Sequence, residues 1–282
     1  MTSDRACHWS QKCSLVIFNM LACIIGYVVG LEAVFVASVW VMGSLCVVDD
    51  YHNGMPCEFN LYEKGSCFIS DHLRMNRVWE KYLHNVFDRY VGSDSVVIEG
   101  GCHVGSHTLK LAYLSRHVHA FEPLPSSFSL LSKNKEINQM DNITLHKKAL
   151  SDVQGVARYG WSTPSNPGAS GLADNPMGLP SWSGECSEEV EVEVTTIDAL
   201  KLDKLDFIKL DIEGYEPLAI QGGMATIASF MPIITMEIWS DHFGNLDINH
   251  PKTIFKNLLD LGYVYGQIGS SPDFLFVPSS RL

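Results

Sequence analysis

Basic residues are scarce in this sequence. Its 282 residues include 20 lysines and arginines against 32 aspartates and glutamates, which gives a formal net charge of −12. Proteins that bind the phosphate backbone of nucleic acids gather lysine and arginine on one face, and no basic cluster occurs here. The composition therefore argues against nucleic acid as a partner and favours a neutral or small-molecule substrate.

Common metal-binding and dinucleotide-binding motifs are also missing. The eight cysteines form no CxxC pair, and the glycine-rich turn near residue 100 lacks the GxGxxG spacing. His103 and His107 stand four residues apart, but no HExxH sequence or third ligand accompanies them. Zinc binding by this pair is therefore disfavoured. We expect His103 to point into a ligand cleft and His107 to lie on a helix surface.

One long apolar run is present. Residues 14–48 carry a single formal charge, Glu32, and a membrane-spanning helix needs about 20 apolar residues. We expect residues 1–48 to form an N-terminal hydrophobic helix kept as a membrane anchor, because the apolar part of a cleaved signal peptide is usually shorter. One span is favoured over a hairpin of two. The side of the membrane that holds the rest of the chain stays open.

Two other features depend on the compartment. Cys57 and Cys67 could close a small disulfide loop under oxidising conditions. Asn142 begins an Asn-Ile-Thr glycosylation sequon. The sequence does not decide whether either one is used.

Residues 49–92 connect this run to the rest of the chain. Glycine, asparagine and proline over 49–70 predict a linker or a short hairpin. An apolar stripe that includes Leu73, Tyr82 and Val86 predicts a leading helix over 71–91.

From residue 93 onward, short apolar strands alternate with helical segments. Strands are predicted at 95–99, 117–121, 142–146, 206–210 and 231–237, and helices near 105–115, 125–138, 214–228 and 250–261. This pattern predicts an α/β fold with a mostly parallel sheet covered by helices on both faces. Two apolar segments around a Gly-Ser-Ser-Pro turn predict an antiparallel hairpin that finishes the sheet. Residues 160–189 are rich in glycine, proline and serine, and a loop of this length is typical of a functional lid.

The turn in the segment VVIEGGCHVGSHTLKLA, residues 96–112, is the first candidate site. Ligands of open parallel sheets bind beyond the carboxyl ends of the strands. Gly101 and Gly105 let the backbone approach a ligand closely, and the helix that follows supplies free N–H groups. An acid at the strand end, Glu99, suits a cofactor with a cationic sulfonium and an amino-acid tail better than a pyrophosphate. A turn without a ligand is the alternative.

Two further acids follow neighbouring strands. Glu122 lies about 20 residues after the glycine turn, where an acid can accept hydrogen bonds from ribose hydroxyls. Asp152, or the backbone beside it, could meet an adenine amino group, although a plain turn is equally consistent with the sequence there.

Carboxylates also gather at two later strand ends. Asp211 and Glu213 follow one strand, and Glu237 ends the next, with His242 shortly after it. Such a cluster is costly unless it binds a cation, a proton or a ligand amine. We therefore assign a functional role to Asp211 and Glu237.

Taken in order, VVIEGGCHVGSHTLKLA, VHAFEP, KALSD, VTTIDAL, LDFIKLDIEGYE and PIITMEI resemble the FkbM family of methyltransferases. The resemblance covers about residues 95–240 and implies an FkbM-type domain over 93–282. It implies a Rossmann-like class I methyltransferase fold, S-adenosylmethionine as the cofactor, and methylation of hydroxyl oxygens on sugars or natural products. The family commonly has aspartate at the position of Glu99 and asparagine at that of His103.

The resemblance also implies roles for single residues. Those expected to bind the cofactor are Glu99, Gly101, His103, Gly105, Glu122 and Asp152. Those expected near the transferred methyl group are Asp211, Glu213 and Glu237. A hydroxyl acceptor needs a proton acceptor as well as positioning, and the candidates are Asp211, Glu237 and His242. A divalent metal ion bridging Asp211, Glu213 and Glu237 is the alternative way to lower the pKa of the acceptor hydroxyl.

The sequence therefore predicts an O-methyltransferase acting on a sugar, a glycan, or a lipid-linked or natural-product hydroxyl. Methylation of a protein or a carboxylate is a second enzymatic hypothesis. A membrane-anchored binding module with a degenerate site is the non-enzymatic one, and the unusual Glu99 and His103 motivate it.

Overall fold

The structure is a computed structural model that describes residues 45–161, 167, 170–172, 188–238 and 256–282. Residues 46–282 form one compact unit. The predicted anchor up to residue 44 and the candidate base His242 lie outside the described residues. Of the helices within those ranges, none has the length and hydropathy needed to cross a bilayer.

A seven-stranded sheet with the order β12-β13-β11-β10-β3-β4-β5 forms the centre of this unit. Its strands are β3 (Val96–Gly100), β4 (His117–Phe121), β5 (Ile143–His146), β10 (Phe207–Leu210), β11 (Ile233–Glu237), β12 (Tyr263–Gln267) and β13 (Asp273–Pro278). The first five pair in parallel, while β13 is antiparallel to both β11 and β12. The predicted α/β fold, its mostly parallel sheet and its closing hairpin are therefore confirmed.

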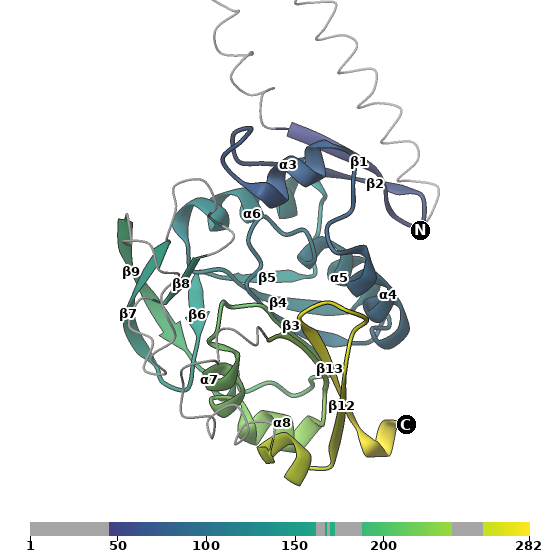
Figure 1. The fold of residues 1–282 in the computed structure, drawn as a ribbon, viewed down its shortest axis with the longest axis vertical. Helices are drawn as coiled ribbons and strands as arrows, with labels where there is room; N and C mark the ends of the chain where they lie inside the picture. Colours follow the sequence, from purple (N-terminus) through teal and green to yellow (C-terminus); the bar gives the residue numbers. More distant parts are fainter. Residues whose placement is uncertain (1–44, 162–166, 168–169, 173–187, 239–255) are drawn as a thin grey trace, which may run out of the picture. The chain divides into compact units, whose positions relative to one another are not determined.

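Helices cover both faces of this sheet (Figure 1). One face carries α4 (Lys81–Tyr90), α5 (Thr108–Leu114) and α6 (Pro125–Ile137), and the other carries α7 (Glu216–Gln221) and α8 (Met224–Phe230). Because successive strand residues point to opposite faces, Val97 belongs to the first core and Ile98 to the second. Strands β3, β4, β10, β11 and β13 contribute side chains to both cores.

Two predicted helices are broken in the structure. The helix predicted over 214–228 is interrupted at Gly222 and Gly223, between α7 and α8. A Cβ atom at Gly222 would lie 2.1 Å from the carbonyl oxygen of Ser151, so the close packing of these two segments requires glycine. The helix predicted near 250–261 is described only over residues 256–260, which are helical.

The leading helix is likewise two helices, α3 (Phe68–Arg74) and α4. Asn76 and Glu80 between them adopt left-handed backbone angles, with φ values of 57° and 43°. Asn76 Oδ1 accepts a hydrogen bond from the backbone N–H of Asp49, and its side-chain amide donates to Asp49 Oδ2, so the break is attached to the segment that precedes α3. The buried face of α4 is formed by Leu83 and Phe87, one position later than the predicted stripe.

The segment before α3 is a two-stranded sheet, β1 (Leu45–His52) and β2 (Met55–Asn60). Asn53 and Gly54 join the strands with positive φ values of 50° and 77°, as the Asn-Gly turns of tight hairpins require. Of the predicted range 49–70, residues up to Asn60 form a hairpin, while residues 68–70 already belong to α3. Residues 45–48, which the sequence analysis placed at the end of the hydrophobic segment, belong to β1.

A second sheet was not predicted. It has the order β6-β9-β7-β8 and consists of β6 (Lys148–Leu150), β7 (Gly155–Trp161), β8 (Ser170–Leu172) and β9 (Glu188–Thr195). Strand β8 lies within the segment predicted to be a continuous loop, and it pairs with β7. The alternation of glutamate and valine over 188–194 was the available signal, because a period of two is typical of a half-buried strand.

The two cysteines of the possible disulfide and the asparagine of the sequon make other contacts in the structure. Cys57 and Cys67 are free thiols, so the disulfide that the sequence allows is not formed. Cys57 Sγ lies 3.3 Å from Asn138 Oδ1, and Cys67 Sγ lies 3.6 Å from His103 Nε2. The side-chain amide of Asn142, the sequon asparagine, donates two hydrogen bonds to backbone carbonyls.

Two asparagines, Asn134 in α6 and Asn138 just after its last residue, attach β2 to the rest of the unit. Asn134 accepts a hydrogen bond from the backbone N–H of Asn60 and donates to the carbonyls of Asn60 and Val104, at 3.0 and 2.7 Å. Asn138 accepts from the N–H of Glu58 and donates to its carbonyl. These amides substitute for a neighbouring strand along the edge of β2.

We expect Asn134→Ala to lower the free energy of unfolding by about 2–3 kcal/mol, because buried backbone groups would lose their partners. Urea denaturation of the full chain measures this change. The matched control is Ser129→Ala on an exposed position of the same helix. Equal midpoints for the two variants would contradict this role for Asn134.

Candidate functional site

A cavity lies at the carboxyl ends of β3, β4 and β10, where the predicted turn meets three of the predicted acids. Its lining includes five predicted site residues, namely Gly101, His103, Glu122, Asp211 and Glu213. The parallel sheet brings them together, because the carboxyl ends of its strands share one edge.

The glycine turn has positive φ values of 80° at Gly101 and 91° at Gly105. A Cβ atom at Gly101 would lie 1.7 Å from the carbonyl oxygen of Asp211, and one at Gly105 would lie 2.8 Å from Leu131 Cδ1. Gly101 therefore lets the turn touch the end of β10 and face the cavity. Gly105, which is not among the lining residues, lets the turn pack on α6.

Glu122 lies at the end of β4, buried against the glycine turn. Its two carboxylate oxygens accept hydrogen bonds of 2.8 Å from the backbone N–H groups of His103 and Leu124. Burial raises the pKa of Glu122 to about 7. The oxygens keep lone pairs that can accept further hydrogen bonds from a ligand.

Glu99 is placed differently from the prediction, inside the sheet and outside the cavity lining. Its side chain is 1% exposed, and neither carboxylate oxygen has a hydrogen-bond partner. Burial raises the pKa of this carboxyl. Lys209 stands opposite it in the register of β3 and β10.

Lys209 is a candidate functional residue that the sequence analysis missed. Its Nζ atom lies 3.1 Å from Asp211 Oδ2, with the lysine 2% and the aspartate 30% exposed. Although burial alone would lower the pKa of Lys209, the carboxylates of Asp211 and Glu99 raise it. The same ion pair lowers the pKa of Asp211 against the opposing effect of burial. A lysine within the apolar strand FIKL was the available signal.

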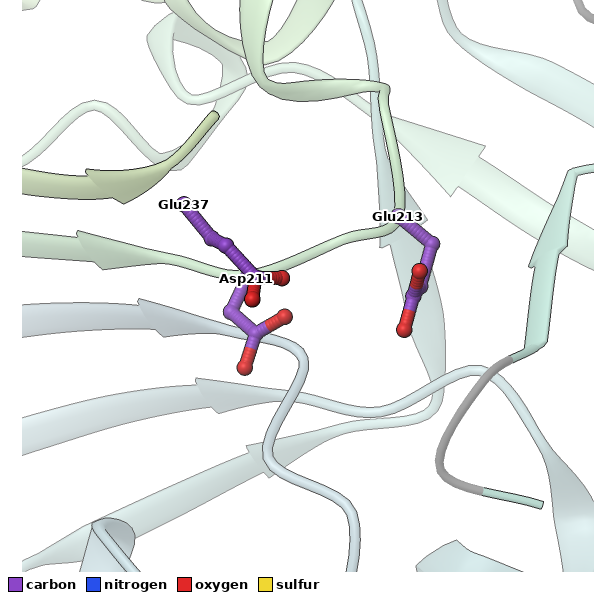
Figure 2. A group of neighbouring side chains, drawn as sticks. All are labelled: Asp211, Glu213 and Glu237. Atoms are coloured by element: carbon purple, nitrogen blue, oxygen red, sulfur yellow. The ribbon is translucent and has the colours of Figure 1, made fainter. Parts of the chain in front are cut away.

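Three carboxylates meet beyond the ends of β10 and β11. One oxygen from each of Asp211, Glu213 and Glu237 lies within 4.8 Å of the others. Figure 2 shows Asp211 beside Glu237, with Glu213 on the turn that follows β10. Carboxylate oxygens are suitable ligands for magnesium or calcium. Lys209 already supplies one positive charge to this group.

His107 is buried, and the prediction of a surface position is wrong. It precedes the first residue of α5 and faces α4, where its Nε2 atom lies 3.0 Å from Glu80 Oε2. Burial lowers the pKa of His107 to about 3, so the ring is neutral. His103 does line the cavity, as predicted.

Helix α3 and the segment that joins it to α4 form part of the same site. Ile69 and Trp79 line the cavity. Glu80 accepts a hydrogen bond of 3.2 Å from the hydroxyl of Tyr82, and burial, followed by the charge of Asp211, raises its pKa to about 7. Nothing in the local sequence indicates this contribution, because the contacts join segments far apart in the chain.

Residues 99–265 match the methyltransferase FkbM domain. The chain belongs to the FkbM methyltransferase family. The resemblance seen in its sequence motifs is therefore confirmed, and the matched residues include both the glycine turn and the carboxylate cluster.

Several relatives resemble this family member. Methyltransferase 1 from Beauveria bassiana (strain ARSEF 2860) is 25% identical over 147 residues, which cover 46% of this chain and 58% of that protein. The crystal structure of methyltransferase FkbM from Methylobacillus flagellatus KT has a TM-score of 0.45 and 15% identity, covering 74% of this chain and 59% of that one. A Streptococcus mutans protein crystallised with SAH has a TM-score of 0.42 and 10% identity, covering 70% and 94%. This chain thus spans little more than half the length of the first two relatives.

A third residue expected at the cofactor site of the FkbM domain, after Glu99 and Gly105, lies beyond the cavity lining. Asp152 accepts a hydrogen bond of 3.2 Å from its neighbour Ser151, while Lys148, Ala149 and Leu150 of β6 line the cavity. The strand before the turn therefore faces the cavity, and the adenine role of Asp152 stays a prediction.

The buried acids of this FkbM domain predict a pH-dependent stability. Burial raises the pKa of Glu216 from 4.5 to about 7, as it does for Glu122. The folded state therefore keeps these protons over a pH range in which the unfolded chain has lost them. The stabilisation is present below pH 4.5 and is lost as the pH rises through 7.

The free energy of unfolding of the parent chain should fall between pH 5 and pH 8 as Glu216 ionises. In Glu216→Gln this fall should be smaller by up to about 3 kcal/mol. Denaturant titrations at several pH values measure this slope. Glu136→Gln, on an exposed position of α6, is the control and should keep the slope of the parent chain. A parent-like slope for Glu216→Gln would show that Glu216 ionises normally.

Proposed function

We propose that this protein is an S-adenosylmethionine-dependent methyltransferase that methylates a hydroxyl oxygen of a neutral acceptor, such as a sugar, a glycan or a lipid-linked molecule. The observation that carries the proposal is a single cavity of an FkbM domain in which the glycine turn, Glu122 and the Lys209–Asp211 pair meet. The apolar run over residues 14–48 adds support for a lipid-linked acceptor.

The lining of the cavity fits this cofactor. Phe121, Ala149 and Leu150 offer an apolar surface for an adenine ring, and Glu122 offers carboxylate oxygens for ribose hydroxyls. Gly101 itself lines the cavity, so the backbone of this turn is within reach of a ligand there. When bound, the cofactor supplies the electrophilic methyl group.

The carboxylate cluster fits the acceptor half of the reaction. The acceptor hydroxyl has to lose its proton as its oxygen gains the methyl group, so a carboxylate within hydrogen-bond reach can take that proton. Asp211 and Glu237 lie side by side at the required edge of the sheet. Lys209 keeps Asp211 ionised, which prepares it to hold the hydroxyl in position.

The charges of the cavity favour a neutral acceptor. Asp211, Glu213 and Glu122 face it, and each of the two lining lysines is already paired with a carboxylate. Lys209 pairs with Asp211, and Lys148 Nζ lies 2.8 Å from Glu193. An anionic acceptor such as a phosphate or a carboxylate would be repelled.

The proposal predicts that the full chain binds S-adenosylmethionine in calorimetry and transfers a labelled methyl group to an acceptor from fractionated lipids or glycans. Asp211→Asn and Glu237→Gln should each lower kcat by about 100-fold or more, since general-base catalysis contributes 10²–10⁴-fold. Asp203→Asn, an exposed aspartate, is the control. Labelling confined to proteins would favour the second enzymatic hypothesis.

If both carboxylate variants kept the kcat of the parent chain at saturating acceptor, the proton-acceptor role would be wrong. If the parent chain failed to bind S-adenosylmethionine, the degenerate binding module would replace the enzyme as the better hypothesis.

An apolar wall of the cavity suggests how the acceptor body is held. Trp79 packs edge-on against Phe68 and His72, with ring centroids 5.6 and 5.3 Å away, and Ile69 lines the cavity beside it. An indole held in this way can pack against the C–H face of a sugar or against an alkyl chain. This wall comes from residues that precede the matched domain.

We expect Trp79→Ala to raise the acceptor KM about 10-fold, which corresponds to about 1.4 kcal/mol, while the affinity for S-adenosylmethionine changes little. Trp79→Phe, which keeps an aromatic face, should lie between Trp79→Ala and the parent chain. An unchanged acceptor KM together with weakened cofactor binding would instead place Trp79 on the cofactor.

A further inference from the structure

The outward face of α3 carries large apolar side chains. Phe68 begins this helix and Met75 directly follows its last residue, and they are 66% and 56% exposed. Seven residues, or about two helical turns, separate them, so they lie on one side of the helix. Ser70 and Leu73 on the other side are buried. Large apolar side chains exposed together typically mark a contact with another protein or with a membrane.

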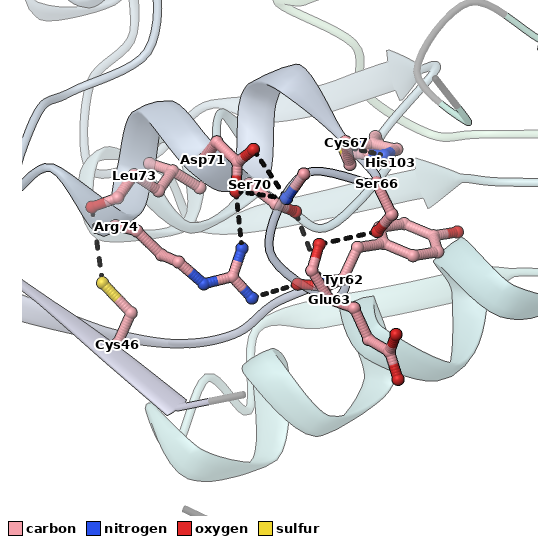
Figure 3. Close-up of polar contacts among 11 residues, drawn as sticks. Cys46, Tyr62, Glu63, Ser66, Cys67, Ser70, Asp71, Leu73, Arg74 and His103 are labelled. Carbon is pink, nitrogen blue, oxygen red and sulfur yellow. Dashed lines mark hydrogen bonds and ion pairs between the residues drawn. The ribbon is translucent and has the colours of Figure 1, made fainter. Parts of the chain in front are cut away.

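Helix α3 is held in place by polar contacts at its carboxyl end. Arg74 donates a hydrogen bond to the backbone carbonyl of Tyr62 and forms a 3.1 Å ion pair with Asp71 (Figure 3). Asp71 in turn accepts a hydrogen bond from the backbone N–H of Gly65. The exposed face is therefore preformed and does not have to fold when it meets a partner.

This face continues into the cavity. The indole of Trp79 packs edge-on against the rings of Phe68 and His72. Trp79 and Ile69 of α3 both line the cavity. An alkyl chain can therefore pass from the outward face of α3 to the cavity while it stays in contact with apolar side chains.

Three cations flank α3 in the sequence. Lys64, Arg77 and Lys81 are exposed. None of them forms an ion pair with another residue in the part of the chain that the structure describes. The chain as a whole has a formal net charge of −12, so this group differs from its general character. Lysine and arginine beside exposed phenylalanine are typical of segments that lie in the interface of an anionic bilayer.

Strand β1 connects α3 to the apolar run that the sequence predicts to be a membrane anchor. Cys46 Sγ lies 3.3 Å from the carbonyl oxygen of Leu73, the contact drawn in Figure 3, and Asp49 is hydrogen-bonded to Asn76. Only two residues separate Cys46 from position 44, and an extended chain advances about 3.5 Å per residue. The polar layer on each side of a bilayer is about 5–8 Å thick. With the run in a membrane, α3 therefore lies at the surface of that membrane.

We propose that the outward face of α3 rests on the surface of an anionic bilayer, with Phe68 and Met75 among the lipid head groups and the three flanking cations beside the lipid phosphates. The cavity then opens at the membrane surface, and a lipid-linked acceptor reaches Trp79 without its alkyl chain crossing water. This route for the acceptor rests on the proposed function, whereas the contact of α3 with the bilayer does not.

The test uses the full chain in nanodiscs of phosphatidylcholine, alone or mixed in equal parts with phosphatidylserine. Each disc also contains a trace of phosphatidylcholine with a photoactivatable diazirine beside its head group. Irradiation attaches this lipid to side chains at the bilayer surface, and mass spectrometry of peptides locates the adducts. The internal control is the peptide with Val153 and Val156, which are 58% and 66% exposed and lie at and before the start of β7.

We expect at least about 10-fold more adduct on the peptide with Phe68 and Met75 than on the control peptide, because only the first would lie within the head groups. Phe68→Ser combined with Met75→Ser should lower the adduct on α3 about 10-fold, since burying one phenylalanine is worth at least that factor. Val156→Ser should leave the adduct on α3 unchanged.

Phosphatidylserine should raise the adduct on α3 in the parent chain, because the cations are attracted to anionic lipid. Lys64→Glu combined with Arg77→Glu should abolish this increase. Lys147→Glu combined with Lys201→Glu is the matched control, since it reverses two exposed lysines outside residues 64–81 and should keep the increase.

Equal adduct on α3 and on the control peptide would overturn the proposal, as would a parent-like yield in the double serine variant or equal yields with and without phosphatidylserine. Dimers in detergent that dissociate in the double serine variant would assign this face to a second copy of the chain instead. Labelling requires neither cofactor nor acceptor. A chain that labels as expected but binds no S-adenosylmethionine would therefore disprove the proposed function and leave the membrane contact standing.

Discussion

The turn after β3 and the end of β10 touch through their backbones, and the site depends on this contact. At Gly101 a Cβ atom would lie 1.7 Å from the carbonyl oxygen of Asp211, so only glycine allows it. The contact places the surface proposed for the cofactor directly beside the carboxylate proposed for the acceptor. Methyl transfer requires the two reactants to be held close together in a fixed orientation. The contact between the two strand ends would hold the two binding surfaces in that arrangement.

Electrostatics at this edge of the sheet are dominated by buried acids and one buried lysine. Lys209 is paired with Asp211, while burial raises the pKa values of Glu80, Glu122 and Glu216 to about 7. Burying so many acids has a cost in stability, and such arrangements are typical of functional sites. The fold tolerates them because backbone N–H groups, the lysine and tyrosine hydroxyls satisfy much of their hydrogen bonding.

The N-terminal hairpin and its two short helices belong to the site although they precede the matched domain. Tyr62 and Cys67 hold His103, Trp79 lines the cavity, and Glu80 contacts His107. Asn134 and Asn138 of α6 attach the hairpin, so the segment is a fixed wall. Substitutions in this segment can therefore change the shape and polarity of the site. The glycine turn and the carboxylates of the site lie within the matched domain.

The sequence alone determined where the central strands lie along the chain, the closing hairpin, the glycine turn and the acids at strand ends, because these depend on local periodicity and on the geometry of parallel sheets. It did not show that α3 and α4 are separate, that β6 to β9 form a second sheet, or that His107 is buried. Those outcomes rest on contacts between distant segments, such as Asn76 with Asp49 and His107 with Glu80. The partners of Lys209 and His103 were likewise decided by tertiary structure, since burial and charge depend on which segments meet.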